Sequence, residues 1–296
     1  MPKFRSARAQ ADHAVSKKVA LKKARHNHKQ DRQIHSVGTA RNYSQALKKF
    51  AQYLQDHRMG DLSSATSIEA CQYLQNRALL VAQKTLDLDR QAIQLKLGEK
   101  LEVVKSQKET RLTTRSYTAV QINRIAAAQT DINSLSTRIA YAAGLRAHEL
   151  LTLQPISERK ASTHREWKAE RFYGRTGTRY TVVGKGGLIR EVLIPGELAT
   201  LLEDKRLPEL RHVADRGVNY IQLYDIGGGQ AWSQSFSAAS KRELGFSNGA
   251  HGVRHSYAQE RMEELQNSGM PCAAAKATIA QELGHFDKKT TEAYFR

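Results

Sequence analysis

The chain of 296 residues is long enough for two domains, each with its own hydrophobic core. Its 47 Lys and Arg against 29 Asp and Glu give a net charge of +18. This charge favours a polyanionic partner, with DNA or RNA ahead of a membrane surface, although a basic protein without such a partner stays open. No apolar run approaches the roughly 20 residues of a membrane span, and the charged N-terminus lacks the apolar stretch of a secretory signal. The distant cysteines Cys71 and Cys272 exclude a zinc site built on cysteine and favour a reducing cytoplasm.

Residues 1–33 form the most basic segment, with ten Lys and Arg against Asp12 and Asp31. Its larger apolar side chains are few, namely Phe4, Val15, Val19 and Leu21. We therefore expect a basic N-terminal arm that builds no core and is disordered, or helical only on its partner. A solvated tail without a role is the alternative. His26 and His28 have no acidic or cysteine neighbours and are expected to be solvated rather than metal-bound.

Apolar residues repeat at helical spacing in the next segment. Three or four short helices are expected, the first marked by Tyr43, Leu47, Phe50 and Leu54. Gly98 ends the last of them. The pattern predicts a small all-helical domain over residues 34–98, followed by a polar linker over residues 99–112.

Residues 113–296 combine helical patterns with a β-type pattern in the middle of the segment. Two β-type runs, 179–183 and 190–194, flank a glycine-rich turn, which predicts a hairpin ended by Pro195. Helical signals surround the hairpin, at residues 118–125, 134–144, 197–205, 233–244, 251–266 and 273–283. The expected fold class is therefore mainly α with a small antiparallel β-sheet (α+β).

Two stretches of this larger domain carry cations suited to a phosphate. Arg146 follows a glycine turn between two helices, and its planar guanidinium matches two phosphate oxygens. Glu149, three residues on, can orient a neighbour. Lys185 lies at the hairpin tip between glycines, without the residue order of a Walker loop. Taken alone, each also fits an ordinary surface charge.

Two further stretches supply candidates for proton transfer and attack. His251 and Arg254 are three residues apart on one expected helix and so share a face. His285 precedes Tyr294 by nine residues near the end of the chain. Together the four stretches provide cations for a phosphate, groups for proton transfer and a tyrosine oxygen as nucleophile. No Asp/Glu cluster is placed to hold Mg²⁺, which argues against two-metal nuclease chemistry, and no cofactor is expected.

In this company and order, the motifs resemble those of the tyrosine recombinases of the phage-integrase family. The resemblance rests on Gly144-Leu145-Arg146 with Glu149, Gly184-Lys185-Gly186, His251-Gly252-Val253-Arg254, and Leu283-Gly284-His285 with Tyr294. It covers the chain in motif detail from about Thr118 to the end. The helical segment before it agrees with the family's core-binding domain in pattern only, and the rest corresponds to the catalytic domain.

The resemblance implies a role for each candidate. Tyr294 would attack the scissile phosphate and form a 3′-phosphotyrosyl bond, releasing a 5′-hydroxyl without ATP or metal. His251 would handle the tyrosine proton, and Lys185 would protonate the leaving oxygen. The phosphate would be held by Arg146, Arg254 and His285, with Glu149 in support.

The same resemblance implies the partners. It predicts double-stranded DNA as the substrate and a homo-oligomer (a tetramer on synapsed DNA), with accessory DNA-bending factors as further candidate partners. It also predicts a cytoplasmic, nucleoid-associated protein, typically encoded on a mobile genetic element. Two residues follow Tyr294, where many members have a segment that docks on a neighbouring protomer, so the coupling between protomers stays open. The charged stretch 158–175 is longer than the family needs and is expected to be an extra DNA contact.

Two other functions remain open at this point. One is relaxation of DNA like that of a type IB topoisomerase, which uses the same residue types without strand exchange. The other is a catalytically silent relative that only occupies DNA. The separate helical domain and the complete set of site residues favour recombination.

Overall fold

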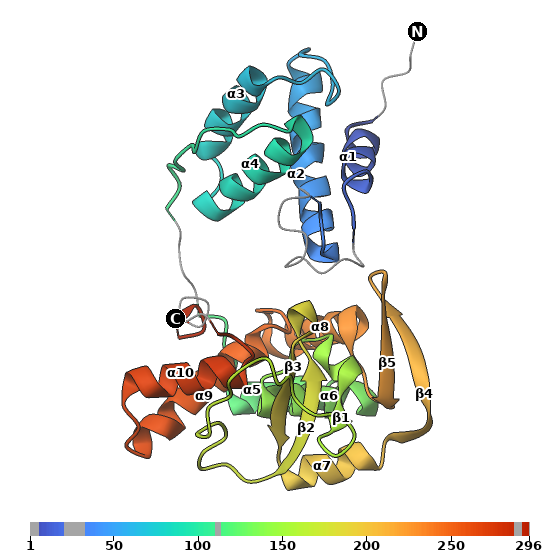
Figure 1. Ribbon diagram of the computed structural model, residues 1–296, viewed down its shortest axis with the longest axis vertical. Coiled ribbons are helices and arrows are strands. Elements are labelled where there is room, and N and C mark those ends of the chain that lie inside the picture. Colours follow the sequence, from blue (N-terminus) through green and yellow to red (C-terminus); the bar gives the residue numbers. More distant parts are fainter. Residues whose placement is uncertain (1–5, 21–32, 110–113, 287–291, 296) are drawn as a thin grey trace. The chain divides into compact units, whose positions relative to one another are not determined.

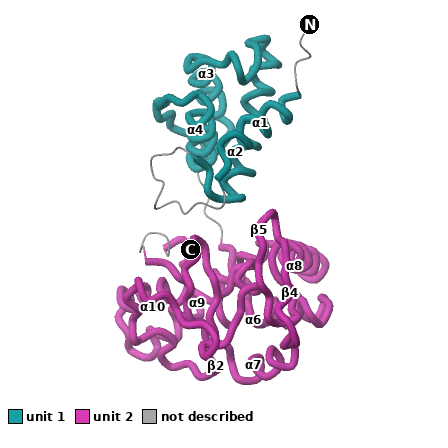
Figure 2. The backbone as a smooth tube through the Cα atoms, turned by 45° about the vertical axis from the view of Figure 1, so that its right-hand side comes forward, with its two compact units in different colours: residues 1–112 teal, residues 113–296 magenta. Residues whose placement is uncertain are grey.

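The computed structural model describes residues 6–20, 33–109, 114–286 and 292–295. The chain divides into two compact units, residues 1–112 and 113–296 (Figures 1 and 2). Each unit has its own buried core, and each is described by itself. Among the described residues no helix is both long and apolar enough to cross a membrane.

The described part of the first unit is a bundle of helices: α1 (Ala7–Ser16), α2 (Val37–Asp56), α3 (Ser67–Ala78) and α4 (Gln83–Leu97) (Figure 1). Local chemistry sets their ends. The Ser36 hydroxyl accepts a hydrogen bond from the Thr39 amide at 3.1 Å and begins α2. Gly98, with φ of 82°, ends α4 in the left-handed conformation that glycine adopts without strain.

Helix α1 corrects the expectation of a basic arm that builds no core. Ala7, Ala11 and Val15 are buried against α2, in the same core as Phe50. These residues are spaced four apart, so they share one face of the helix, and their small size lets α1 pack closely. The helix can therefore join the core without large apolar side chains. Residues 1–5 and 21–32 of the expected arm, the latter with His26 and His28, lie outside the described residues.

Residues 99–109 also differ from expectation, because they pack on the first unit instead of running free as a linker. Leu101 is buried in the helical core. The Gln83 side chain donates to the Val104 carbonyl at 3.0 Å and accepts from the Ser106 amide at 2.8 Å. These bonds attach the segment to the start of α4. Residues 110–112 of the expected linker are outside the described range.

The second unit is mainly helical with two small antiparallel sheets, which confirms the predicted fold class. Its helices are α5 (Ala119–Ala127), α6 (Asp131–Ala143), α7 (Gly196–Glu203), α8 (Gly229–Leu244), α9 (Gly252–Asn267) and α10 (Cys272–Glu282). One sheet has the order β1 (Gln154–Pro155), β2 (Thr178–Val183) and β3 (Ile189–Ile194). The other, which the sequence patterns did not predict, is the hairpin of β4 (Arg206–Asp215) and β5 (Val218–Tyr224).

Alternation along β2 and β3 decides which side chains enter the core. Tyr180 pairs with Val192 and Val182 pairs with Arg190, so these four share one face of the sheet. All four are buried, Arg190 with 1% of its surface exposed. A charged side chain thus occupies an inward position beside apolar neighbours, and it must find polar partners there.

The charged stretch 158–175 was expected to be an extra DNA contact, but several of its arginines bind within the protein. The Arg159 guanidinium donates to the backbone carbonyls of Thr152 and Thr181. Arg171 lies over the Trp167 ring at 4.6 Å. The cations of this stretch that remain exposed are Lys160, Arg165 and Lys168.

Candidate active site

The turn after α6 brings Arg146 and Glu149 together. Gly144 ends α6 with φ of 59°, and a Cβ there would lie 2.8 Å from the Tyr257 ring, so glycine suits this position. The chain then enters a short 3₁₀ turn, η2 (Glu149–Thr152). Glu149 accepts from the Arg146 amide at 2.8 Å and from its Nη1 at 2.7 Å. This pair fixes the guanidinium at the turn, as the three-residue spacing indicated.

Arg254, on the first turn of α9, is fully buried. Its Nη1 donates to the Gly144 carbonyl, and its Nη2 donates to the Leu283 carbonyl at 2.9 Å. Its Nε is buried and has no hydrogen-bond partner among the described residues. Burial, followed by repulsion from Arg146, lowers the pKa of Arg254 to about 10, so the guanidinium stays charged at neutral pH. A buried cation with an unused donor is suited to bind an anion.

The end of α10 carries His285 to Arg146. After α10 the chain passes through Gly284, with φ of 73°, and the His285 Nε2 lies 2.8 Å from Arg146 Nη2. Because a guanidinium only donates, His285 Nε2 is the acceptor and the ring proton is on Nδ1. Burial, followed by the charges of Arg254 and Arg146, lowers the pKa of His285 to about 3. His285 is therefore neutral at pH 7.

Tyr294 lies against the same cluster, with 5% of its surface exposed. The Arg254 guanidinium carbon is 5.7 Å from the centre of the tyrosine ring. The Tyr294 hydroxyl is 3.3 Å from His251 Nε2, a distance at which the hydroxyl can donate to the ring nitrogen. Partial burial, followed by the charge of Arg254, lowers the pKa of His251 below its usual range. A neutral His251 can therefore accept a proton at pH 7.

Charge is unevenly balanced at this site. Glu149 is fully buried, which by itself would raise its pKa, but Arg190, Arg254 and Arg146 hold that pKa well below the usual range. Three guanidiniums therefore share one carboxylate, and the two histidines beside them are neutral. The cluster has an excess of about two positive charges, which favours an anionic ligand.

Lys185 is the predicted site residue whose side chain the structure does not bring to this cluster. It is exposed on the turn η3 (Lys185–Gly187) between β2 and β3, without a described contact to another site residue. Its neighbour Gly184 is nearer: a Cβ there would lie 3.9 Å from Arg146 Nη1 and 3.4 Å from a Glu149 oxygen. The turn therefore begins at the cluster, and Lys185 is one residue further on.

Two side chains of the cluster were missed by sequence reasoning. Arg190 donates to the Glu149 carboxylate at 2.7 Å, and its position in β3, two residues before the buried Val192, was the available signal. His255 lies with its ring centre 4.7 Å from that of Tyr294. It directly follows Arg254, and sequence alone gave no reason to separate it from a core histidine.

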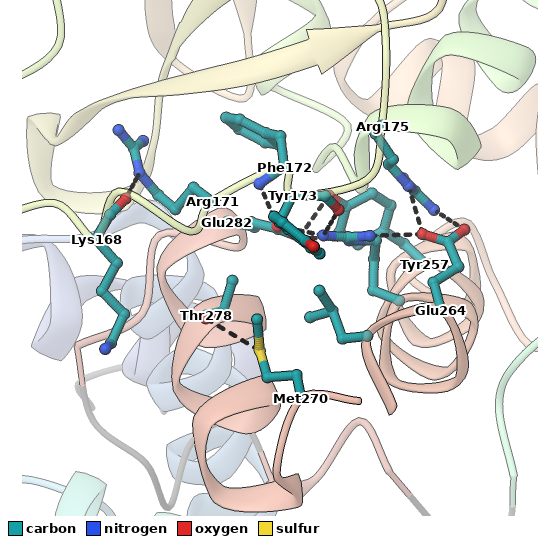
Figure 3. Close-up of polar contacts among 12 residues, drawn as sticks. Lys168, Arg171, Phe172, Tyr173, Arg175, Tyr257, Glu264, Met270, Thr278 and Glu282 are labelled. Carbon is teal, nitrogen blue, oxygen red and sulfur yellow. Dashed lines mark hydrogen bonds and ion pairs between the residues drawn. The ribbon is translucent and has the colours of Figure 1, made fainter. Parts of the chain in front are cut away.

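A buried polar network holds the end of α10, which leads to His285 (Figure 3). The Glu282 carboxylate accepts hydrogen bonds from the Tyr257 hydroxyl at 2.8 Å, from the Phe172 amide at 2.8 Å and from Arg261 at 3.0 Å. In the same network region, Arg175 binds Glu264 of α9 at 2.7 Å. These bonds tie α10 to α9 and to the segment before β2. They fix the turn that carries His285.

Potential metal ligands do not gather in the described residues, where no group of three or more His, Cys, Asp or Glu is placed to hold a metal ion.

Comparison with known proteins identifies the fold. No family model matches the chain, and no curated protein matches it. Among solved structures, the XerH site-specific recombinase bound to a palindromic difH substrate, a post-cleavage complex, matches 98% of this chain and 90% of its own at 15% identity, with a TM-score of 0.57. The pre-cleavage complex of XerH with difH matches 98% of this chain and 92% of its own at 17% identity, with a TM-score of 0.52. The chain therefore has a tyrosine-recombinase fold.

Proposed function

We propose that this protein is a site-specific DNA recombinase that breaks and rejoins strands through a phosphotyrosyl intermediate at Tyr294. One observation supports this most directly: the Tyr294 hydroxyl lies 3.3 Å from a neutral His251 nitrogen, beside the buried guanidinium of Arg254. A nucleophile, a proton acceptor and an anion-binding cation are thus adjacent. The same fold occurs in a recombinase seen with DNA before and after cleavage.

In the first step, the Tyr294 oxygen attacks the phosphorus of a DNA phosphodiester. Its proton passes to His251 Nε2, the P–O5′ bond breaks, and the 5′-oxygen leaves as a hydroxyl. The new bond joins the 3′-phosphate to the tyrosine. Attack by the 5′-hydroxyl of another strand reverses these events and reseals DNA, and the proton returns to Tyr294.

The charge of the cluster supports the same step. A phosphodiester carries one negative charge, and the five-coordinate transition state carries about two. The excess of about two positive charges around Glu149 matches that transition state better than the ground state. Arg146 and Arg254 are assigned to the non-bridging oxygens, and His285 supports them by accepting a hydrogen bond from Arg146 and so holding that guanidinium in place.

The leaving oxygen still needs a proton. We assign this role to Lys185, whose turn begins at Gly184 beside Arg146, so that a closing movement of a few residues at the exposed turn would bring its ammonium to the phosphate. The ammonium donates one proton to the 5′-oxygen as the P–O bond breaks. DNA bound across the site is the natural cause of that movement.

The wider assignments rest on the same proposal. The first unit, residues 1–112, would serve as the core-binding domain and residues 113–296 as the catalytic domain. The substrate would be double-stranded DNA, with a tetramer at synapsis.

The decisive test is a covalent adduct on a nicked DNA substrate that loses its 5′-hydroxyl strand after cleavage. The wild type should accumulate adduct, and Tyr294→Phe should form none while binding DNA with nearly unchanged affinity. Tyr173→Phe is the matched control, because it removes a tyrosine hydroxyl of the same domain from an exposed side chain. Adduct in Tyr294→Phe, or its absence in the wild type, would refute the assignment. Relaxation of plasmids that lack any specific site would instead indicate topoisomerase activity.

A further inference from the structure

Arg190 connects three parts of the site that are distant in sequence. It extends from β3 with 1% of its surface exposed. Its Nη2 donates to Glu149 Oε2 at 2.7 Å, and its Nη1 donates to the Glu282 carbonyl at 2.7 Å, on the last residue of α10. Gly284 packs against it, since a Cβ there would lie 2.8 Å from Arg190 Cδ. One side chain thus joins β3, η2 and the turn before His285.

The shared carboxylate creates a competition between arginines. Glu149 Oε2 accepts from Arg190 at 2.7 Å, whereas Arg254 Nη1 is 3.6 Å from the same oxygen. Arg254 instead donates to two backbone carbonyls, those of Gly144 and Leu283. Arg146 already binds the other oxygen of this carboxylate at 2.7 Å. If the charge of Arg190 were removed, the buried carboxylate would therefore attract Arg254, the remaining cation near Oε2. Arg254 would then be withdrawn from its carbonyls and from an incoming phosphate.

The other contact of Arg190 acts on His285. The Glu282 carbonyl lies three residues before His285, and the Glu282 side chain is already held by the network of Figure 3. Loss of the Arg190 bond would leave this carbonyl buried without its partner and free the turn to shift. A shift of His285 would break its 2.8 Å contact with Arg146.

We propose that Arg190 is a positioning residue for strand transfer, which keeps Glu149 from capturing Arg254 and holds His285 against Arg146. This inference rests on the proposed function, because it concerns the rate of attack by Tyr294. Arg190 does not need to touch the phosphate. Its effect should therefore fall on the chemical step and not on DNA affinity.

The test is a double-substitution series measured as single-turnover adduct formation on the nicked substrate. Arg190→Met should slow adduct formation about 100-fold, with DNA affinity changed by less than about threefold, because misplacement by about 1 Å has effects of that order. Adding Glu149→Gln to Arg190→Met removes the capturing charge but keeps an oxygen that can accept from Arg146 Nη1, and should recover about tenfold of the rate. A double variant slower than Arg190→Met would overturn the proposal.

Two measurements separate positioning from loss of stability and from failure of the proposed function. Arg159→Met removes another arginine of the same domain, one that binds Thr152 and Thr181, and should not slow adduct formation comparably. Nitrogen-15 NMR of His285 should show the Nδ1–H form in the wild type and a change in Arg190→Met, whatever the DNA result. An unchanged His285 signal, or equal slowing by Arg159→Met, would refute the positioning role. No adduct in the wild type would refute only the proposed function.

Discussion

At the scale of single residues, Lys185 is the predicted group whose chemistry is least determined by the resting geometry. An exposed lysine can either hold the DNA backbone or donate a proton. An alkoxide is a poor leaving group, whereas a 5′-bridging sulfur leaves without protonation. Lys185→Ala should therefore slow cleavage far more than binding on normal DNA, and should recover most of its rate on DNA with sulfur at the bridging 5′ position. The measurement is adduct formation on both substrates.

The control for this prediction is Arg146, which contacts Glu149 and His285 and is assigned to the non-bridging oxygens. Arg146→Ala should not be rescued by the sulfur substrate, because its loss affects charge and orientation. If sulfur also fails to rescue Lys185→Ala, the lysine binds DNA without donating a proton. His251 would then be the first alternative for the acid.

His255 makes a separate prediction about stability and pH. It is 8% exposed, and burial, followed by the charges of Arg115 and Arg254, lowers its pKa to about 4. The unfolded histidine titrates near 6.5, so the unfolded state gains a proton first as the pH falls. Stability from this residue is complete above about pH 7 and should fall by about 2 kcal/mol between pH 7 and pH 5.

Urea unfolding followed at pH 7 and pH 5 measures this loss. His255→Gln should flatten the pH dependence by about 2 kcal/mol. His251 and His285, whose pKa values are lowered in the same direction, should preserve part of the slope in this variant. A His255→Gln protein with the full wild-type slope would contradict the assignment.

At the scale of elements, α1 and β3 show what sequence patterns miss. Helix α1 was not predicted to join a core because the segment has few large apolar side chains. Its packing face consists of Ala7, Ala11 and Val15. In β3, Arg190 lies two residues before Val192 and shares its inward face, so the burial of Arg190 could be predicted. Its acceptor in η2 could not be predicted from the sequence. A buried charge in a strand is a signal that an unidentified carboxylate lies nearby.

The packing of α1 can be tested by one substitution. Ala11 is fully buried, so Ala11→Asp places a carboxylate in an apolar contact and should lower the unfolding free energy by about 2–4 kcal/mol. Ala9→Asp, on the exposed side of the same helix, should change it by less than about 0.5 kcal/mol. Chemical denaturation of the full chain measures both. Equal stability of the two variants would show that α1 does not pack in solution.

At the scale of the whole molecule, the fold class and the residues that lie together at the site were predicted from different features of the sequence. Periodicity located most helices and the β2–β3 hairpin, while β4 was missed because its strand Arg206–Asp215 is mostly polar and contains Pro208. That Arg146, Arg254 and Tyr294 would lie together was predicted from the order of the motifs and not from periodicity. Distances between them depend on packing that sequence does not show, and Lys185 illustrates the limit.

Charge is distributed unevenly between the two units. Residues 1–112 contain 22 Lys and Arg against 10 Asp and Glu, a net +12 of the total +18, which leaves +6 for residues 113–296. On the proposed function, the first unit should therefore provide most of the sequence-independent contacts with phosphates. Deleting residues 1–33 would be a poor test of this idea, because it removes α1 and with it part of the core.

A test that leaves the core intact neutralises exposed cations at the end of α1. Lys17→Gln with Lys18→Gln keeps the buried face of α1 and should reduce the slope of log K against log[salt] by up to about 2, since each phosphate contact contributes about 0.9. At low salt and saturating protein, adduct formation at Tyr294 should match the wild type, because the chemical cluster is untouched. The measurement is DNA affinity over a salt series, with circular dichroism to confirm that α1 persists. An unchanged slope would mean that these two lysines do not contact DNA, and the counterion release must then come from other cations of the chain.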